Sequence, residues 1–132
     1  MLRLLVDGGS LRLMMNRSGK INTWAIMDLL YNWVNYSSEY MEAGYLIDSE
    51  GFVHLRGTIL NATDRGEKIC QMPQVYTPHR AAYGISLYGG DAIKRLYVSK
   101  SGRIILPGGA GSGWVNIDNI SWWVGKERLR QL

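Results

Sequence analysis

The stretch 44–60, GYLIDSEGFVHLRGTIL, constrains the fold most, because it alternates apolar and polar side chains on either side of a tight turn. Residues 48–51 are turn formers, and the glycine among them can adopt a positive φ. The stretch therefore predicts strands over 45–48 and 52–60. In the second strand one face carries Val53, Leu55 and Ile59, and the other carries His54, Arg56 and Thr58. A period of two predicts a sheet with one buried face and one face in water.

The rest of the chain repeats this pattern of short strands and turns. The 132 residues include 16 glycines but only 3 prolines, which suits short strands joined by tight turns. Further strands are predicted over 69–72, 83–88, 93–99, 103–106, 114–117 and 120–124, and a hairpin near the N-terminus over 2–15. Turn signals recur about every 8–12 residues, which is typical of an all-β fold, either an antiparallel β-sandwich or a small barrel.

The segment 24–34 departs from this pattern. Asp28, Asn32 and Asn35 fall within one narrow arc of a helical wheel, and Asn22 or Thr23 could cap a helix there. A short helix, an irregular linker and a buried strand all fit so short a segment. It would join an N-terminal hairpin or neck, residues 1–22, to a β-sandwich head over 23–125, with a charged C-terminal tail over 126–132.

Charge and cysteine content limit the class of protein. The net charge of +4 is spread along the chain, so a nucleic-acid interface is disfavoured, although mild attraction to polyanions remains. The single Cys70 excludes an intramolecular disulfide and a Cys-based zinc site, and its apolar strand predicts a core residue. No apolar run has the roughly 18 residues of a membrane span, and no signal peptide is visible, so we expect a soluble chain that is not exported by such a signal.

Catalytic patterns are also missing from the sequence. The acidic residues lie mostly in predicted turns, and neither His54 nor His79 is accompanied by a nucleophile motif or by metal-ligand spacing. The glycine-rich run 107–113 lacks the Gly-Lys-Ser/Thr ending of a phosphate-binding loop and leads into a strand at Trp114. We therefore expect a protein that is not an enzyme, with no cofactor and no metal.

Aromatic side chains are the remaining candidates for a functional surface. In the last strand, alternation places Trp122 in the core and Trp123 outside. By the same alternation, the side chain of Trp114 lies on the other face of its strand from Val115 and Ile117. Tyr88 shares a face with Gly84 and Ser86, opposite Ile85 and Leu87. Exposed rings beside small polar side chains suit a saccharide site, in which the sugar stacks on the ring. For any single ring, core packing or a subunit interface is the more common role.

The candidate saccharide-binding residues are chosen by two criteria: the face of the strand on which alternation places them, and their position in predicted loops. The stacking candidates are Tyr88, Trp114 and Trp123, and the polar partners are His79, Arg80, Asp91 and Asp118.

Several segments resemble, in the same order, the C-terminal head domain of phage tail-fibre and receptor-binding baseplate proteins from phages and prophages of Gram-positive bacteria. The matching segments are LYNWVNY at 30–36, AGY at 43–45, GFVHLRGTI at 51–59, the pairs Met72-Pro73 and Thr77-Pro78, the hairpin 98–104, and WVNIDNIS at 114–121. The chain departs from the family pattern at Asn32, where glycine is usual, and at Thr77, where arginine is usual.

The resemblance implies a small jelly-roll-like head in the virion, at the tail tip or baseplate. Such a head forms a homotrimer, contacts other tail or baseplate proteins, and binds a host cell-wall saccharide or teichoic acid. Three tethered sites would convert weak single contacts into strong overall attachment. Two alternatives stay open: a structural tail-fibre module that trimerises without binding saccharide, and a cellular carbohydrate-binding domain.

Overall fold

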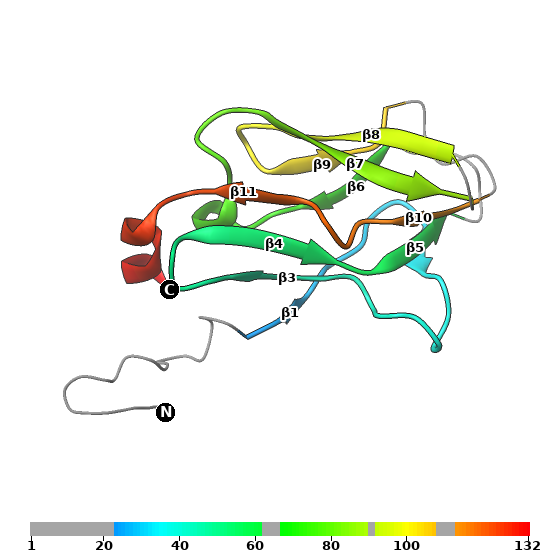
Figure 1. Cartoon of the computed structure of the whole chain (residues 1–132), viewed down its shortest axis with the longest axis horizontal. Coiled ribbons are helices and arrows are strands. Elements are labelled where there is room, and N and C mark those ends of the chain that lie inside the picture. Colours follow the sequence, from blue (N-terminus) through cyan, green and yellow to red (C-terminus); the bar gives the residue numbers. More distant parts are fainter. Residues whose placement is uncertain (1–22, 62–66, 90–91, 108–112) are drawn as a thin grey trace.

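The protein folds into two antiparallel β-sheets, as the sequence predicts (Figure 1). In this computed structural model the described residues are 23–61, 67–89, 92–107 and 113–132. The predicted N-terminal hairpin and Asp91 lie outside them. Among the described residues the only helices are two short 3-10 helices, η2 (Gln74–Tyr76) and η3 (Lys126–Gln131). The prediction of an all-β sandwich or small barrel is confirmed.

The smaller sheet has the strand order β1-β3-β4-β11, and the larger has the order β2-β5-β10-β7-β8-β9-β6. The strands of the smaller sheet are β1 (Ala25–Ile26), β3 (Gly44–Ile47), β4 (Phe52–Arg56) and β11 (Ser121–Trp123). Those of the larger sheet are β2 (Trp33–Asn35), β5 (Thr58–Asn61), β6 (Lys68–Gln71), β7 (Ala82–Tyr88), β8 (Ala92–Val98), β9 (Arg103–Ile105) and β10 (Trp114–Asn116). Every paired neighbour is antiparallel.

The core lies between the inner faces of the two sheets. Val53 and Leu55 from β4 and Ile59 from β5 are fully buried, as the alternation predicts, and Trp122 is buried as well. They belong to one continuous apolar cluster that draws on both sheets. Removing this apolar surface from water is the main force that holds the sheets together.

The predicted strand 52–60 is interrupted at Gly57, where the chain crosses from β4 in one sheet to β5 in the other. Gly57 has a φ of +127°, and a Cβ atom there would lie 2.6 Å from Cα of Ala43. Only glycine fits so close an approach in that conformation. The prediction that Thr58 faces water is wrong: it is buried, and its Oγ1 accepts a hydrogen bond from Nδ2 of Asn116 at 2.9 Å.

The segment 24–34 contains no helix. It forms β1, a connecting loop and the start of β2, and the loop includes two residues in the left-handed region, Tyr31 with φ +52° and Asn32 with φ +71°. Two successive positive φ values are incompatible with a right-handed helix. They turn the chain so that Trp33 enters the core.

The sides of β7 are the reverse of those predicted. Ser86 is buried, whereas Ile85 and Leu87 are 69% and 48% exposed. Because a Cβ atom on Gly84 would lie 2.8 Å from Cγ1 of Ile120, small residues of β7 face the core. Large residues therefore point outward.

The outward side chains of β7 and its neighbour β8 form one surface, since Leu87 pairs with Ile93 and Ile85 with Arg95 across the two strands. We call this surface the outer β7–β8 face; it consists of Tyr83, Ile85, Leu87, Ile93 and Arg95.

Candidate functional site

A groove of about 610 Å³ lies where the end of β11 meets η3. Its lining includes Trp123, His79 from the segment after η2, Glu50 from the β3–β4 turn, and Lys126 and Gln131 from η3. Chain segments far apart in sequence therefore build it together. We call it the Trp123 groove.

Trp123 is the dominant apolar surface of the Trp123 groove. Its side chain is 56% exposed, as alternation predicts, and its Nε1 donates a hydrogen bond to the carbonyl oxygen of Glu50 at 3.1 Å. Gly125 has a φ of +94°, and a Cβ atom there would lie 3.5 Å from the six-membered part of the indole. The hydrogen bond fixes the ring, and the glycine places no side chain beside it.

His79 lies next to this ring. The centroids of the two rings are 6.3 Å apart, with an angle of 55° between their planes. Nε2 of His79 donates to the carbonyl oxygen of Val124 at 2.8 Å, so the neutral ring keeps Nδ1 as an acceptor. The sequence analysis predicted both residues as parts of one site, and the structure brings them together.

The groove also carries charges of both signs. Nζ of Lys126 lies 3.6 Å from Oε1 of Glu50, and the two side chains are 67% and 68% exposed. A pair so exposed contributes little to stability, because water screens it. It offers a donor and an acceptor for the hydroxyl groups of a ligand.

Arg128 holds the wall of the groove in place. Its Nη1 lies within hydrogen-bonding distance of the carbonyl oxygens of Gln74 (3.2 Å), Val75 (2.8 Å) and Thr77 (2.9 Å). This guanidinium group ties η3, within the segment predicted as a charged tail, to η2. Its role in the fold is therefore structural.

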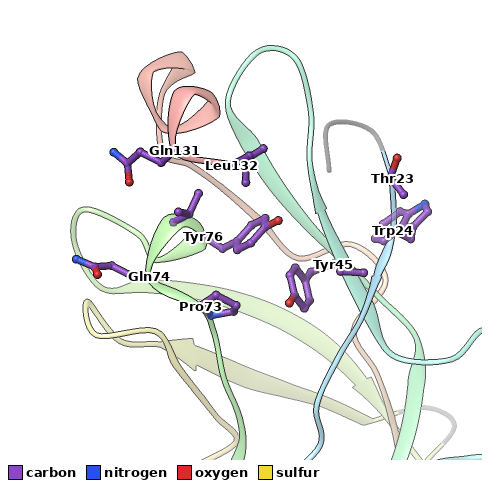
Figure 2. A pocket seen from close by; sticks show the side chains of 10 residues that line it. Thr23, Trp24, Tyr45, Pro73, Gln74, Tyr76, Gln131 and Leu132 are labelled. Atoms are coloured by element: carbon purple, nitrogen blue, oxygen red, sulfur yellow. The ribbon is translucent and has the colours of Figure 1, made fainter. Parts of the chain in front are cut away.

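A second hollow, of about 440 Å³, lies near the other side of η3 (Figure 2). Figure 2 shows Tyr45 and Tyr76 in its middle, with Trp24 on one side and Gln74 and Gln131 on the other. The tyrosine rings meet edge to face, with centroids 4.8 Å apart. Burial raises the pKa of both tyrosines, so both hydroxyls remain protonated at neutral pH. We call this hollow the Tyr45 pocket.

Trp24, at the rim of the Tyr45 pocket, is held by a cation. The guanidinium carbon of Arg56 lies 4.5 Å from the centroid of the indole. The same arginine passes close to Gly44, where a Cβ atom would lie 3.4 Å from its Nε. The stack orients the indole.

Tyr88 and Trp114 do not join the Trp123 groove. β10 begins beside the β7–β8 turn, at the opposite end of the molecule from η3 (Figure 1). Tyr88, predicted to be exposed, is half-buried against the core, with Nζ of Lys94 4.7 Å from its ring centroid. Trp114 is half-buried, and its ring centroid lies 6.4 Å from that of Tyr36.

The other polar candidates are also separate from the groove. Oδ1 of Asp118 accepts a hydrogen bond from the backbone N–H of Gly57 at 2.8 Å, and its Oδ2 accepts one from Asn116 at 3.1 Å, so this carboxylate stabilises a turn. Arg80 is exposed but does not line the groove. Asp91 lies outside the described residues.

Sequence reasoning missed most of the surrounding residues. Glu50 was assigned only to a turn, and Gln74 and Gln131 lie in 3-10 helices with no periodic signal. The pairing of Tyr45 with Tyr76 depends on contact between β3 and η2. A local pattern of alternation carries no information about such contacts.

Cys70 offers no reactive group. It is buried, and burial, reinforced by the negative charge of Asp28, raises the pKa of its thiol to about 12. Within 23–61, 67–89, 92–107 and 113–132, no cluster of three or more His, Cys, Asp or Glu side chains could hold a metal ion. In these same ranges no helix has the length and apolar character needed to cross a membrane.

Comparison with protein-family models, with curated proteins and with solved structures gives no match. The resemblance to phage receptor-binding heads therefore stays a prediction. The fold and the groove define a β-sandwich with an exposed aromatic groove at one end.

Proposed function

We propose that this chain is a saccharide-binding head domain and that the Trp123 groove is its binding site. The observation that carries the proposal is the indole of Trp123, which is more than half exposed yet held by a hydrogen bond to the main chain of Glu50. Aromatic rings of this kind stack on the apolar face of a sugar, while nearby polar groups bind its hydroxyls. His79, Glu50 and Lys126 supply these polar groups.

The biological setting follows from the resemblance: a receptor-binding head at the tail tip or baseplate of a virion, which binds a host cell-wall saccharide or teichoic acid. The antiparallel sandwich is compatible with it. So is Asn32, where the family usually has glycine: its φ of +71° lies in the left-handed region, which glycine adopts freely and asparagine tolerates better than most residues. The net charge of +4 favours encounter with an anionic wall polymer.

We propose further that the head works as a homotrimer and that the outer β7–β8 face lies in the subunit contact. Tyr83, Ile85 and Ile93 are each more than 60% exposed on this face. Neighbouring exposed apolar side chains of this kind are a common mark of protein–protein interaction sites. A second copy of the chain is the occupant that fits the family pattern.

The test of saccharide binding is retention on purified cell walls of Gram-positive bacteria. Wild-type protein should be retained, and Trp123→Ala should weaken retention at least about tenfold, equivalent to about 1.4 kcal/mol, with an unchanged oligomeric state. Tyr40→Ala is the matched control, because this ring is 52% exposed but lies outside the groove.

The experiment also separates the alternatives. A folded trimer that no wall preparation retains would favour the structural tail-fibre module, a reading that the apolar outer β7–β8 face favours independently. A monomer that binds sugars would favour a cellular carbohydrate-binding domain. Dissociation of the trimer by Trp123→Ala would place that ring in the interface.

A further inference from the structure

We infer that the Trp123 groove and the Tyr45 pocket are two subsites of one surface for an extended glycan. The inference rests on the proposed function and makes it more specific, because it assigns a polysaccharide segment as the ligand instead of a single terminal sugar. The proposal places the chain of the glycan along η3, with sugar residues seated on both sides of this helix.

The two hollows are connected through η3. Gln131 of η3 lines both of them. Lys126 and Arg128 of η3 also line the groove, and Leu132, directly after the helix, lines the pocket. A ligand that occupies one hollow and continues past Gln131 therefore reaches the other. A single sugar residue would fill only one.

The Tyr45 pocket repeats the chemistry of the Trp123 groove. It combines aromatic surface from Trp24 and Tyr45 with polar groups from Gln74 and Gln131, and Figure 2 shows these side chains around one opening. Among the described residues neither glutamine amide has a hydrogen-bond partner. Each amide can donate and accept, as the hydroxyl and acetamido groups of wall polysaccharides require.

The surface is also rigid enough for an extended ligand. Arg128 binds η3 to the carbonyl groups of η2, and η2 carries Gln74 and Tyr76 of the pocket. The stack with Arg56 holds Trp24. Side chains fixed before binding lose less conformational entropy when the ligand arrives.

The experiment uses wall polysaccharide that has been partially hydrolysed and separated by size. Affinity of the wild-type protein should rise with fragment length until both hollows are filled. Gln74 lines only the Tyr45 pocket, so Gln74→Ala should lower affinity for long fragments by about three- to tenfold and leave the shortest bound fragments nearly unaffected, because one hydrogen bond to the extended part is lost. Gln74 is exposed, so the fold should be unchanged.

Trp24→Ala is the second variant, and it should also remove the advantage of long fragments. Arg80→Ala is the control, since Arg80 is exposed and lines neither hollow. If affinity is independent of fragment length, or if long fragments bind both variants as tightly as wild type, the inference is overturned. The proposed function would then still stand if Trp123→Ala weakens binding at least about tenfold. Absence of binding by any fragment to the wild-type protein would overturn both.

Discussion

A Cβ atom on Gly84 would lie 2.8 Å from Cγ1 of Ile120, so the backbone of β7 is in direct contact with the segment that leads into β11. This contact decides which side of β7 faces the core. Small residues fit against Ile120, and the large residues Tyr83, Ile85 and Leu87 remain outside. The apolar outer surface of the larger sheet is thus a consequence of close packing between the sheets.

Gly84→Ala should destabilise the fold by about 1–3 kcal/mol, because the added methyl group overpacks the interior. Chemical denaturation would measure the change as a lower midpoint. In the double variant Gly84→Ala/Ile120→Val the loss should be smaller than the sum of the two single losses, since valine makes room. Full additivity would show that the two sites do not touch.

The neighbouring tryptophans Trp122 and Trp123 should respond differently to phenylalanine. Nε1 of Trp122 donates to the buried carbonyl oxygen of Tyr76 at 2.7 Å, and Trp122→Phe leaves this oxygen unpaired. We expect a loss of about 1–3 kcal/mol in unfolding free energy. Trp123→Phe, at an exposed site, should change it by less than about 0.5 kcal/mol. Equal losses would contradict the assignment of Trp122 to the core.

Arg128→Ala should lower the unfolding free energy by about 1–3 kcal/mol, because three carbonyl groups lose a charged donor. Arg130→Ala is a control in the same helix, at an exposed position without a described partner, and should have almost no effect. Thermal unfolding of the two variants side by side checks the difference. Similar melting temperatures would mean that Arg128 does not secure η3.

Asp48, in the turn between β3 and β4, should make the free energy of unfolding depend on pH in the acidic range. Burial alone would raise the pKa of Asp48, but hydrogen bonds from His54 and from the N–H groups of Phe52 and Glu50 outweigh it and lower the pKa below its ordinary value of 3.8. A carboxyl group with a lowered folded-state pKa stabilises the protein above 3.8, and this contribution is lost as the pH falls through the folded-state value.

Asp48→Asn should therefore lower the unfolding free energy at pH 7 and reduce the further loss below pH 3.8. Asparagine keeps an acceptor for the two N–H groups of the turn, which are 2.9 and 3.0 Å from Oδ1, so the hairpin should persist. Urea denaturation at pH 7 and at a pH below 3.8 compares the unfolding free energies of the variant and the wild type. An acid-induced loss as large as that of the wild type would exclude Asp48 as its source.

Self-association should depend on the outer β7–β8 face. Ile85→Lys should convert an oligomer into a monomer, because a buried contact would acquire an unpaired charge. Ile26→Lys provides a matched control: both isoleucines are 69% exposed, but Ile26 lies on β1 of the smaller sheet. Sedimentation velocity at micromolar concentration distinguishes the two species. A wild-type monomer, or an Ile85→Lys oligomer, would contradict the assigned interface.

The strands were predictable because their signals are local. Alternation around Gly51 and Gly102, both with positive φ, marks two hairpins of the structure. What could not be predicted is which side of β7 faces inward, since that depends on Ile120 in a distant segment. Alternation separates Ile85 and Leu87 from the face of Ser86, but it does not say that the face of Ser86 is the buried one.

The candidate site was predictable only in part, for the same reason. Strand parity places Trp123 outside, and His79 lies beside it. Tyr88 and Trp114 follow the same reasoning but lie near the other end of the sandwich. Glu50 lies in a turn and Gln131 in the C-terminal 3-10 helix, and the fold brings both to the groove. A periodic pattern in the sequence does not predict such contacts.

None of the residues of η3 is buried, although this helix borders both hollows. Apart from Arg128, which is bonded to the η2 segment, and Leu129, which packs against the core, substitutions there would alter the shape and charge offered to a ligand at almost no cost to folding. Under the proposed function, a few codon changes in this helix would be enough to change which glycan is bound, while the sheets that support the helix stay the same.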